Sequence, residues 1–177
     1  MRKTTLYIAM SLDGYIAQPN DDLRFLSIVQ KEGEDYGYAK FNSTVDTVIM
    51  GRKTYDWVMK NATEFPHTDK QAFIITRTPK AAIGNTSFYS GSLKTLVLKL
   101  KQEKGKTIFI DGGAEVANSL MKEQLIDELI ISIIPVCIGE GIRLFKDGRP
   151  WTHLQLLESR TFESGLVQLH YQCMKKD

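Results

Sequence analysis

The sequence has few cysteines and histidines, and neither type is grouped. Cys137 and Cys173 both lie in apolar runs, where a cysteine is more often a small buried side chain than a ligand or a nucleophile. We therefore expect reduced thiols, as in a cytoplasmic protein. His67, His153 and His170 have no metal-ligand spacing, so no metal site is predicted.

Positive and negative charges nearly balance, and the sequence has no long apolar run. The 177 residues include 23 Lys and Arg against 21 Asp and Glu, a formal net charge of +2. This balance argues against binding of nucleic acid or a membrane surface, whereas a small anionic ligand needs only a local basic site. No apolar run approaches a membrane span, and the N-terminal run is too polar for a secretory signal. We expect one cytoplasmic domain over residues 1–177.

Short apolar runs alternate with helical periodicities along the first two thirds of the chain. Strands are predicted at 4–10, 47–50, 72–76, 86–89 and 107–110. Helical stripes are predicted within 34–45, 54–59, 93–100 and 116–125. Such alternation with short connections is typical of an α/β fold with a mostly parallel sheet.

The last third of the sequence has a different pattern. Residues 128–138 form a strand-rich apolar stretch, and 154–162 and 166–174 flank Ser164-Gly165 as a β-hairpin. Apolar and polar residues alternate along 167–173, as expected of a strand with one solvated face. The sequence therefore predicts an antiparallel C-terminal hairpin on a mostly parallel sheet. The stretch 129–138 would suit an edge-strand homodimer.

Two strand-to-helix turns have the composition of anion sites. Gly51-Arg52-Lys53-Thr54 follows a buried strand and begins a helix, so free backbone N–H groups, a helix dipole and two cations meet there. The alternative is an ordinary helix start with solvated basic residues. Gly112-Gly113 follows a second buried strand in the same way, and its alternative is an ordinary tight turn. Two such turns at one edge of a sheet fit the diphosphate of a dinucleotide.

A third strand ends at Thr76-Arg77-Thr78. A guanidinium group flanked by two hydroxyl groups suits a phosphate monoester such as the 2′-phosphate of NADP. This favours NADPH over NADH as the cofactor. The alternative is a solvated turn before Pro79.

Asp13 and Asp35 are the candidates for proton chemistry. Asp13 lies where the first predicted strand becomes a glycine-containing loop, so it could serve the turn alone. Asp35 lies in the first turn of a predicted helix, where a carboxylate also complements the helix dipole. The residues alone do not decide between these alternatives.

The order of these motifs resembles the dihydrofolate-reductase superfamily, and more closely the branch that includes the C-terminal reductase domain of bacterial riboflavin biosynthesis. The resemblance rests on residues 9–17, 48–54, 76–78, 110–113 and 135–145 and spans nearly the whole chain. It implies a stand-alone reductase with a three-layer fold, in which helices cover both faces of a central mixed sheet. It also implies cofactor contacts at Ile16, Ala17, Gly51, Arg52, Lys53, Thr54, Arg77, Gly112 and Gly113. Counted back from Val48 without gaps, Asp35 takes the place of the active-site carboxylate of the folate reductases.

The resemblance implies transfer of hydride from NADPH to a small heterocycle of pyrimidine or pterin type. The favoured acceptor is 5-amino-6-(5-phosphoribosylamino)uracil. Dihydrofolate is the second candidate, because residues 18–34 lack the Trp- and Pro-containing pattern of the folate reductases. A non-catalytic NADP-binding module is the alternative from another class of protein. No residue pattern identifies the substrate.

Overall fold

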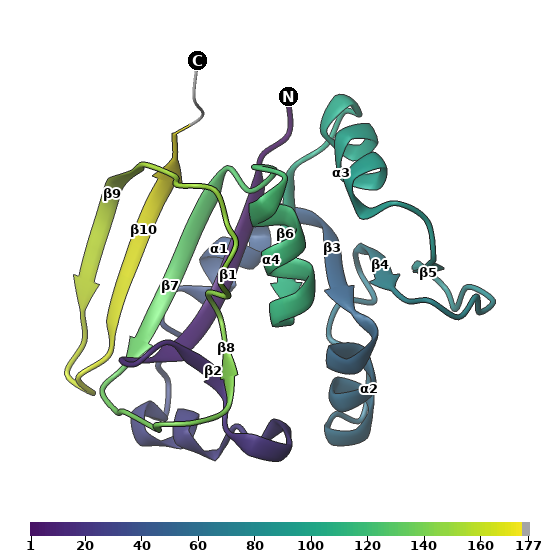
Figure 1. The fold of residues 1–177 in the computed structure, drawn as a ribbon. Helices are drawn as coiled ribbons and strands as arrows, with labels where there is room; N and C mark the ends of the chain where they lie inside the picture. The colour runs from purple at the N-terminus through teal and green to yellow at the C-terminus, as the bar shows by residue number, and fades with distance from the viewer. Residues whose placement is uncertain (175–177) are drawn as a thin grey trace.

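The computed structural model describes residues 1–174, and one large sheet runs through its whole width (Figure 1). The strands are β1 Thr4–Ser11, β2 Tyr15–Ala17, β3 Val45–Gly51, β4 Gln71–Ile75, β5 Thr86–Tyr89, β6 Thr107–Gly112, β7 Glu128–Ile134, β8 Ile142–Arg143, β9 Leu154–Thr161 and β10 Val167–Cys173. The helices are α1 Tyr38–Ser43, α2 Arg52–Asn61, α3 Leu93–Gln102 and α4 Ala114–Lys122, with 3-10 turns η1 Pro19–Asp21 and η2 Arg24–Val29.

The large sheet has the order β5-β4-β3-β6-β1-β7-β10-β9. The six strands from β5 to β7 are parallel to their neighbours, and β10 pairs antiparallel with both β7 and β9. The predicted mixed α/β sheet with an antiparallel C-terminal hairpin is therefore confirmed. Because the parallel strands share one direction, β1, β3, β4 and β6 all end at one edge, the lower edge in Figure 1.

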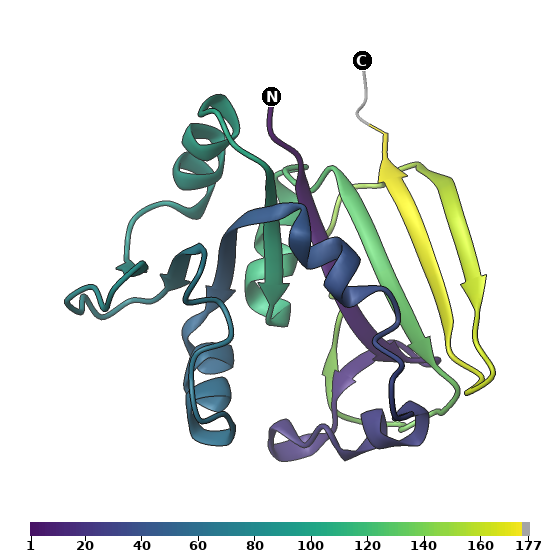
Figure 2. The same cartoon turned by 180° about the vertical axis from the view of Figure 1, so that it is seen from behind.

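Helices cover both faces of the sheet, as predicted for three layers. One core contains buried side chains of α3 and α4, such as Val97 and Leu120, packed with Ile49 and Ile110 of the strands. The other face holds a second core around Phe109, against which Tyr38 and Phe41 of α1 pack. Figure 2 shows α1 crossing this second face. The central strands β3 and β6 therefore alternate their side chains between two buried layers, which explains their mostly apolar sequences.

The edge opposite the strand ends is fixed by buried ion pairs. Lys101 and Asp127 pair with side chains only 5% and 17% exposed, and the Asp127 carboxylate also accepts a hydrogen bond from the backbone N–H of Thr4 at 2.8 Å. Arg2 pairs with Asp46 nearby. These contacts hold the N-terminus beside α3 and β7, far from the turns that follow β3 and β6.

Three expectations are wrong in detail. The helix predicted within 34–45 spans only α1, because Gly37 before it has a left-handed backbone (φ 81) and Val45 already belongs to β3. The stretch 129–138 is not an edge, because β7 pairs on both sides and β9 is the edge strand. Cys137 is exposed, since it follows the end of β7, whereas Cys173 is partly buried.

Among the described helices, none is long and apolar enough to cross a membrane. Within residues 1–174, no three His, Cys, Asp or Glu side chains are grouped as metal ligands.

Candidate functional site

The two predicted anion turns lie against each other at the edge where the parallel strands end. A Cβ atom added to Gly51 would lie 3.7 Å from the Gly113 nitrogen and 3.8 Å from the Gly112 oxygen. A Cβ atom on Gly113 would lie 3.0 Å from Thr54 Oγ1. The missing side chains therefore allow the turn after β3 and the turn after β6 to touch.

Strand pairing produces this contact. Met50 pairs with Gly112 across β3 and β6, after a register shift between Ile49 and Met50. Gly112 has φ +115, a conformation that L side chains rarely adopt, and its peptide bond to Gly113 is cis. A Cβ atom there would lie 3.7 Å from Ile8 Cδ1, so β1 borders the same turn. Two glycine turns and the end of β1 thus form one cradle.

Helix α2 directs its N-terminus at this cradle. Its cap residue Gly51 offers no side chain to the first N–H groups, so these donors are free to bind an anion. Lys53 in the first turn is exposed. Arg52 makes a hydrogen bond to Asp56 at 2.8 Å, which holds its guanidinium group on the helix. The start of α2 therefore offers backbone donors and positive charge together.

Arg77 lies at the end of β4 on the same edge. Its side chain is exposed and makes no hydrogen bond or ion pair with the described residues 1–174. Thr76 Oγ1 accepts a hydrogen bond from the backbone N–H of Thr78 at 3.1 Å, which shapes the turn around Arg77. The guanidinium group is thus available for a ligand near the start of α2.

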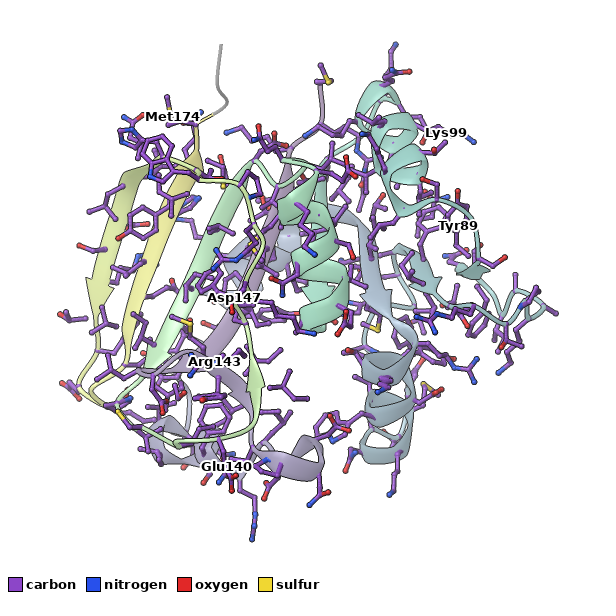
Figure 3. The ribbon with its side chains drawn as sticks, in the orientation of Figure 1. Tyr89, Lys99, Glu140, Arg143, Asp147 and Met174 are labelled. Carbon is purple, nitrogen blue, oxygen red and sulfur yellow. The ribbon has the colours of Figure 1, made fainter. Side chains whose placement is uncertain are left out.

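Ile16 and Ala17 form the other side of this edge, in the short strand β2. Figure 1 shows β2 and α2 on opposite sides of the lower end of the sheet. Ala17 pairs with Ile142 of β8, and Gly141 approaches so closely that an added Cβ atom would lie 2.1 Å from the Ala17 oxygen. Arg143 in β8 lies over the Tyr15 ring at 4.6 Å and is labelled in Figure 3. The contacts with β8 fix the backbone that would face a cofactor.

The carboxylate of Asp13 connects two loops. It accepts hydrogen bonds from the Ser11 hydroxyl at 2.5 Å and from the backbone N–H groups of Ile138 at 3.2 Å and Gly139 at 2.8 Å. The hydrogen bond from Ser11 and then those from the backbone lower the pKa of Asp13, so the group is ionised at neutral pH. This geometry ties the turn after β1 to the segment after β7.

The carboxylate of Asp35 binds backbone N–H groups at the start of helix α1. Its two oxygens each accept a backbone N–H at 2.8 Å, one from Gly37 and one from Ala39. These bonds, that from Ala39 first, lower the pKa of Asp35, and the side chain is exposed. The structure therefore shows Asp35 bound to the backbone at the start of α1, and its role in proton chemistry stays a prediction.

The model of the RibD C-terminal domain family matches residues 2–168. The chain belongs to the RibD C-terminal domain family. It is 44% identical to the protein YwjB of Bacillus subtilis (strain 168) over 171 residues, which cover 96% of this chain and 97% of that protein. The predicted branch of the dihydrofolate-reductase superfamily is thus confirmed.

Solved structures have the same fold. A protein of Shewanella sp. PV-4, provisionally named as a riboflavin biosynthesis protein, matches with a TM-score of 0.88 and 28% identity, covering 98% of this chain and 99% of that chain. A Thermotoga maritima deaminase and 5-amino-6-(5-phosphoribosylamino)uracil reductase matches with a TM-score of 0.71 and 12% identity. The match covers 98% of this chain but 57% of the Thermotoga chain, so at this identity it shows the fold alone.

The sequence did not predict one buried polar residue, His67, at this edge of the sheet. His67 lies in the loop between α2 and β4, and its Nε2 atom is 3.2 Å from Asp111 Oδ2 at the end of β6. Sequence spacing gave no indication of it, because 44 residues separate the pair.

A cavity of about 520 Å³ lies away from the two glycine turns, between α4 and residues 145–152. Asp147 and Met174, labelled in Figure 3, belong to its lining. None of the predicted site residues lines this cavity. The cradle, which joins backbone donors to positive charge, therefore remains the better candidate for a phosphate-bearing ligand.

Proposed function

We propose that the protein is an NADPH-dependent reductase that transfers hydride to a small heterocyclic substrate. The observation that supports this most strongly is the contact between the Gly51 and Gly113 turns at the end of parallel strands. Membership of the RibD C-terminal domain family supports the same reaction class.

The residues of the cradle fit a dinucleotide. Side chains at Gly51 and Gly113 would push apart the two turns whose backbone donors would bind a diphosphate, and Arg52, Lys53 and Thr54 add polar groups beside them. Gly112, Ile16 and Ala17 would contact the remainder of the cofactor, and Arg77 would pair with the 2′-phosphate. Bound NADPH would supply a hydride from its nicotinamide ring. The protein's own contribution is to hold donor and acceptor together and exclude water.

The proposed acceptor is 5-amino-6-(5-phosphoribosylamino)uracil. The name of the Thermotoga protein includes reduction of this compound, and the family model concerns the corresponding domain. Dihydrofolate is the second candidate. A homodimer and a cytoplasmic location stay predictions.

Asp35 and Asp13 are proposed to act on the substrate as carboxylates. Both pKa values are below the usual value, so at neutral pH each group would orient or attract a substrate N–H group and not donate a proton. Their existing backbone contacts mean that substitution would also loosen a loop. A test of either residue therefore needs a control for that loosening.

The experiment measures loss of NADPH absorbance at 340 nm with each candidate acceptor. We expect oxidation that depends on 5-amino-6-(5-phosphoribosylamino)uracil, and at least a tenfold lower kcat for Asp35→Asn. Asp22→Asn is the matched control, because the carboxylate of half-buried Asp22 also accepts a backbone N–H, that of Arg24 at 2.9 Å. Tight NADPH binding without oxidation by either acceptor would instead support a non-catalytic module.

A further inference from the structure

His67 is a buried polar residue with one unused atom. Its side chain is 2% exposed and packs edge-on against the rings of Phe65 at 5.4 Å and Phe109 at 5.9 Å. The buried Nδ1 atom has no hydrogen-bond partner within residues 1–174. An unpaired buried polar atom costs stability, so a phenylalanine here would suit the aromatic surroundings better. Within residues 1–174, the one hydrogen-bond contact of the imidazole ring is with Asp111.

Asp111 lies where that contact affects the proposed site. It directly precedes the Gly112–Gly113 turn at the end of β6, and its side chain is 26% exposed. His67 holds Oδ2 at 3.2 Å, while Oδ1 accepts no hydrogen bond from any described residue. The contact with His67 thus preorganises the carboxylate, and its other oxygen is left to accept a hydrogen bond from a ligand.

Tyr38 offers a hydroxyl donor on the same face of the sheet as Asp111. Its ring packs against Phe109 at 6.5 Å, on the face of the sheet that Phe109 shares with Asp111 two residues later. Burial first, and then the charge of Asp111, raise the pKa of Tyr38 to about 12, so the phenol keeps its proton. Its hydroxyl makes no hydrogen bond with the described part of the chain.

We infer that His67 is a positioning residue, which fixes Asp111 so that its free oxygen and the Tyr38 hydroxyl bind adjacent N–H and C=O groups of a lactam heterocycle. Uracil-type rings present this donor–acceptor edge. This inference rests on the proposed function, because it names residues of the same site that would hold and orient the substrate ring.

The first test needs no substrate. Two-dimensional ¹H–¹⁵N spectra of the imidazole ring in the wild-type protein should show His67 protonated at Nε2 and bare at Nδ1. Asp111→Asn should move the Nε2 signal of His67. A tautomer protonated at Nδ1, or a His67 signal unchanged by Asp111→Asn, overturns the inference whether or not the protein is a reductase.

The second test measures binding of 5,6-diaminouracil by calorimetry in the presence of saturating NADP⁺. We expect Asp111→Asn to weaken binding about tenfold to hundredfold, since it removes a charged acceptor. His67→Phe should weaken binding roughly threefold to tenfold through lost orientation of Asp111. His67→Gln, which restores an N–H donor, should bind within about twofold of wild type.

The matched control is His170→Phe. His170 Nε2 lies 3.0 Å from Glu128 Oε2, a second histidine–carboxylate pair on β10 and β7. This variant should bind 5,6-diaminouracil as the wild type does. Equal binding by His67→Phe and wild type, or equal losses in His67→Phe and His170→Phe, overturns the inference. Failure of the wild type to bind NADP⁺ would instead contradict the proposed function.

Discussion

Gly113→Ala tests the contact between the two glycine turns. Gly113 has φ −77, which alanine adopts without strain, so the substitution changes only the space beside Thr54. The new Cβ atom would lie 3.0 Å from Thr54 Oγ1, about half an ångström inside a comfortable contact. Relief of this overlap requires the Thr54 side chain to turn or the two turns to separate by a few tenths of an ångström.

The expected cost of Gly113→Ala is about 1 kcal/mol of stability, at the low end for one added methyl group. A domain of this size would then melt about 2–4 °C lower. Separation of the turns should also weaken NADPH binding about tenfold. Calorimetric melting and titration with NADPH measure the two effects.

A double-mutant cycle with Thr54→Ala supplies the control. Removal of Oγ1 should abolish most of the stability loss caused by Gly113→Ala, because the overlapping atom is gone. Additive stability losses, or unchanged NADPH affinity in Gly113→Ala, would refute the claim that the turns form one cradle.

Three further outcomes are expected. Arg77→Ala should weaken NADPH binding about tenfold to hundredfold and leave NADH binding unchanged, and equal wild-type affinity for both cofactors would contradict its role. Burial raises the pKa of Asp127, but hydrogen bonds, chiefly from Lys101, hold it below its usual 3.8. The ionised Asp127 therefore stabilises the fold above pH 3.8, and this contribution is lost as the pH falls through the lowered pKa. The urea midpoint of Asp127→Asn should accordingly depend less on pH between about 5 and 3 than that of the wild type. Burial raises the pKa of Cys173 to about 11, so iodoacetamide at pH 8 should modify exposed Cys137 first, and equal rates by mass spectrometry would contradict this.

The sheet and the glycine turns could be predicted because their signals are local. A run such as residues 48–50 is apolar at every position only if both faces of its strand are buried. The turn that ends such a strand must lie at the carboxyl edge, where Gly51 and Gly112 meet. The order of motifs then allowed a family resemblance to be recognised.

Other features depend on contacts between distant residues. The pairing of His67 with Asp111 arises because the loop after α2 folds under β6. Counting residues gives Asp35 the place of a carboxylate. However, α1 begins later than expected, after Gly37, so Asp35 lies before the helix and accepts the backbone N–H of Ala39. The stretch 129–138 resembles an exposed edge in sequence, whereas β10 covers it.

The most direct measurement is a crystal structure of the protein with NADPH bound. The proposed site predicts the diphosphate against the backbone N–H groups of the Gly51 and Gly113 turns, with the 2′-phosphate next to Arg77. NADPH in the cavity of about 520 Å³ beside α4, or bound without contact to either turn, would contradict it.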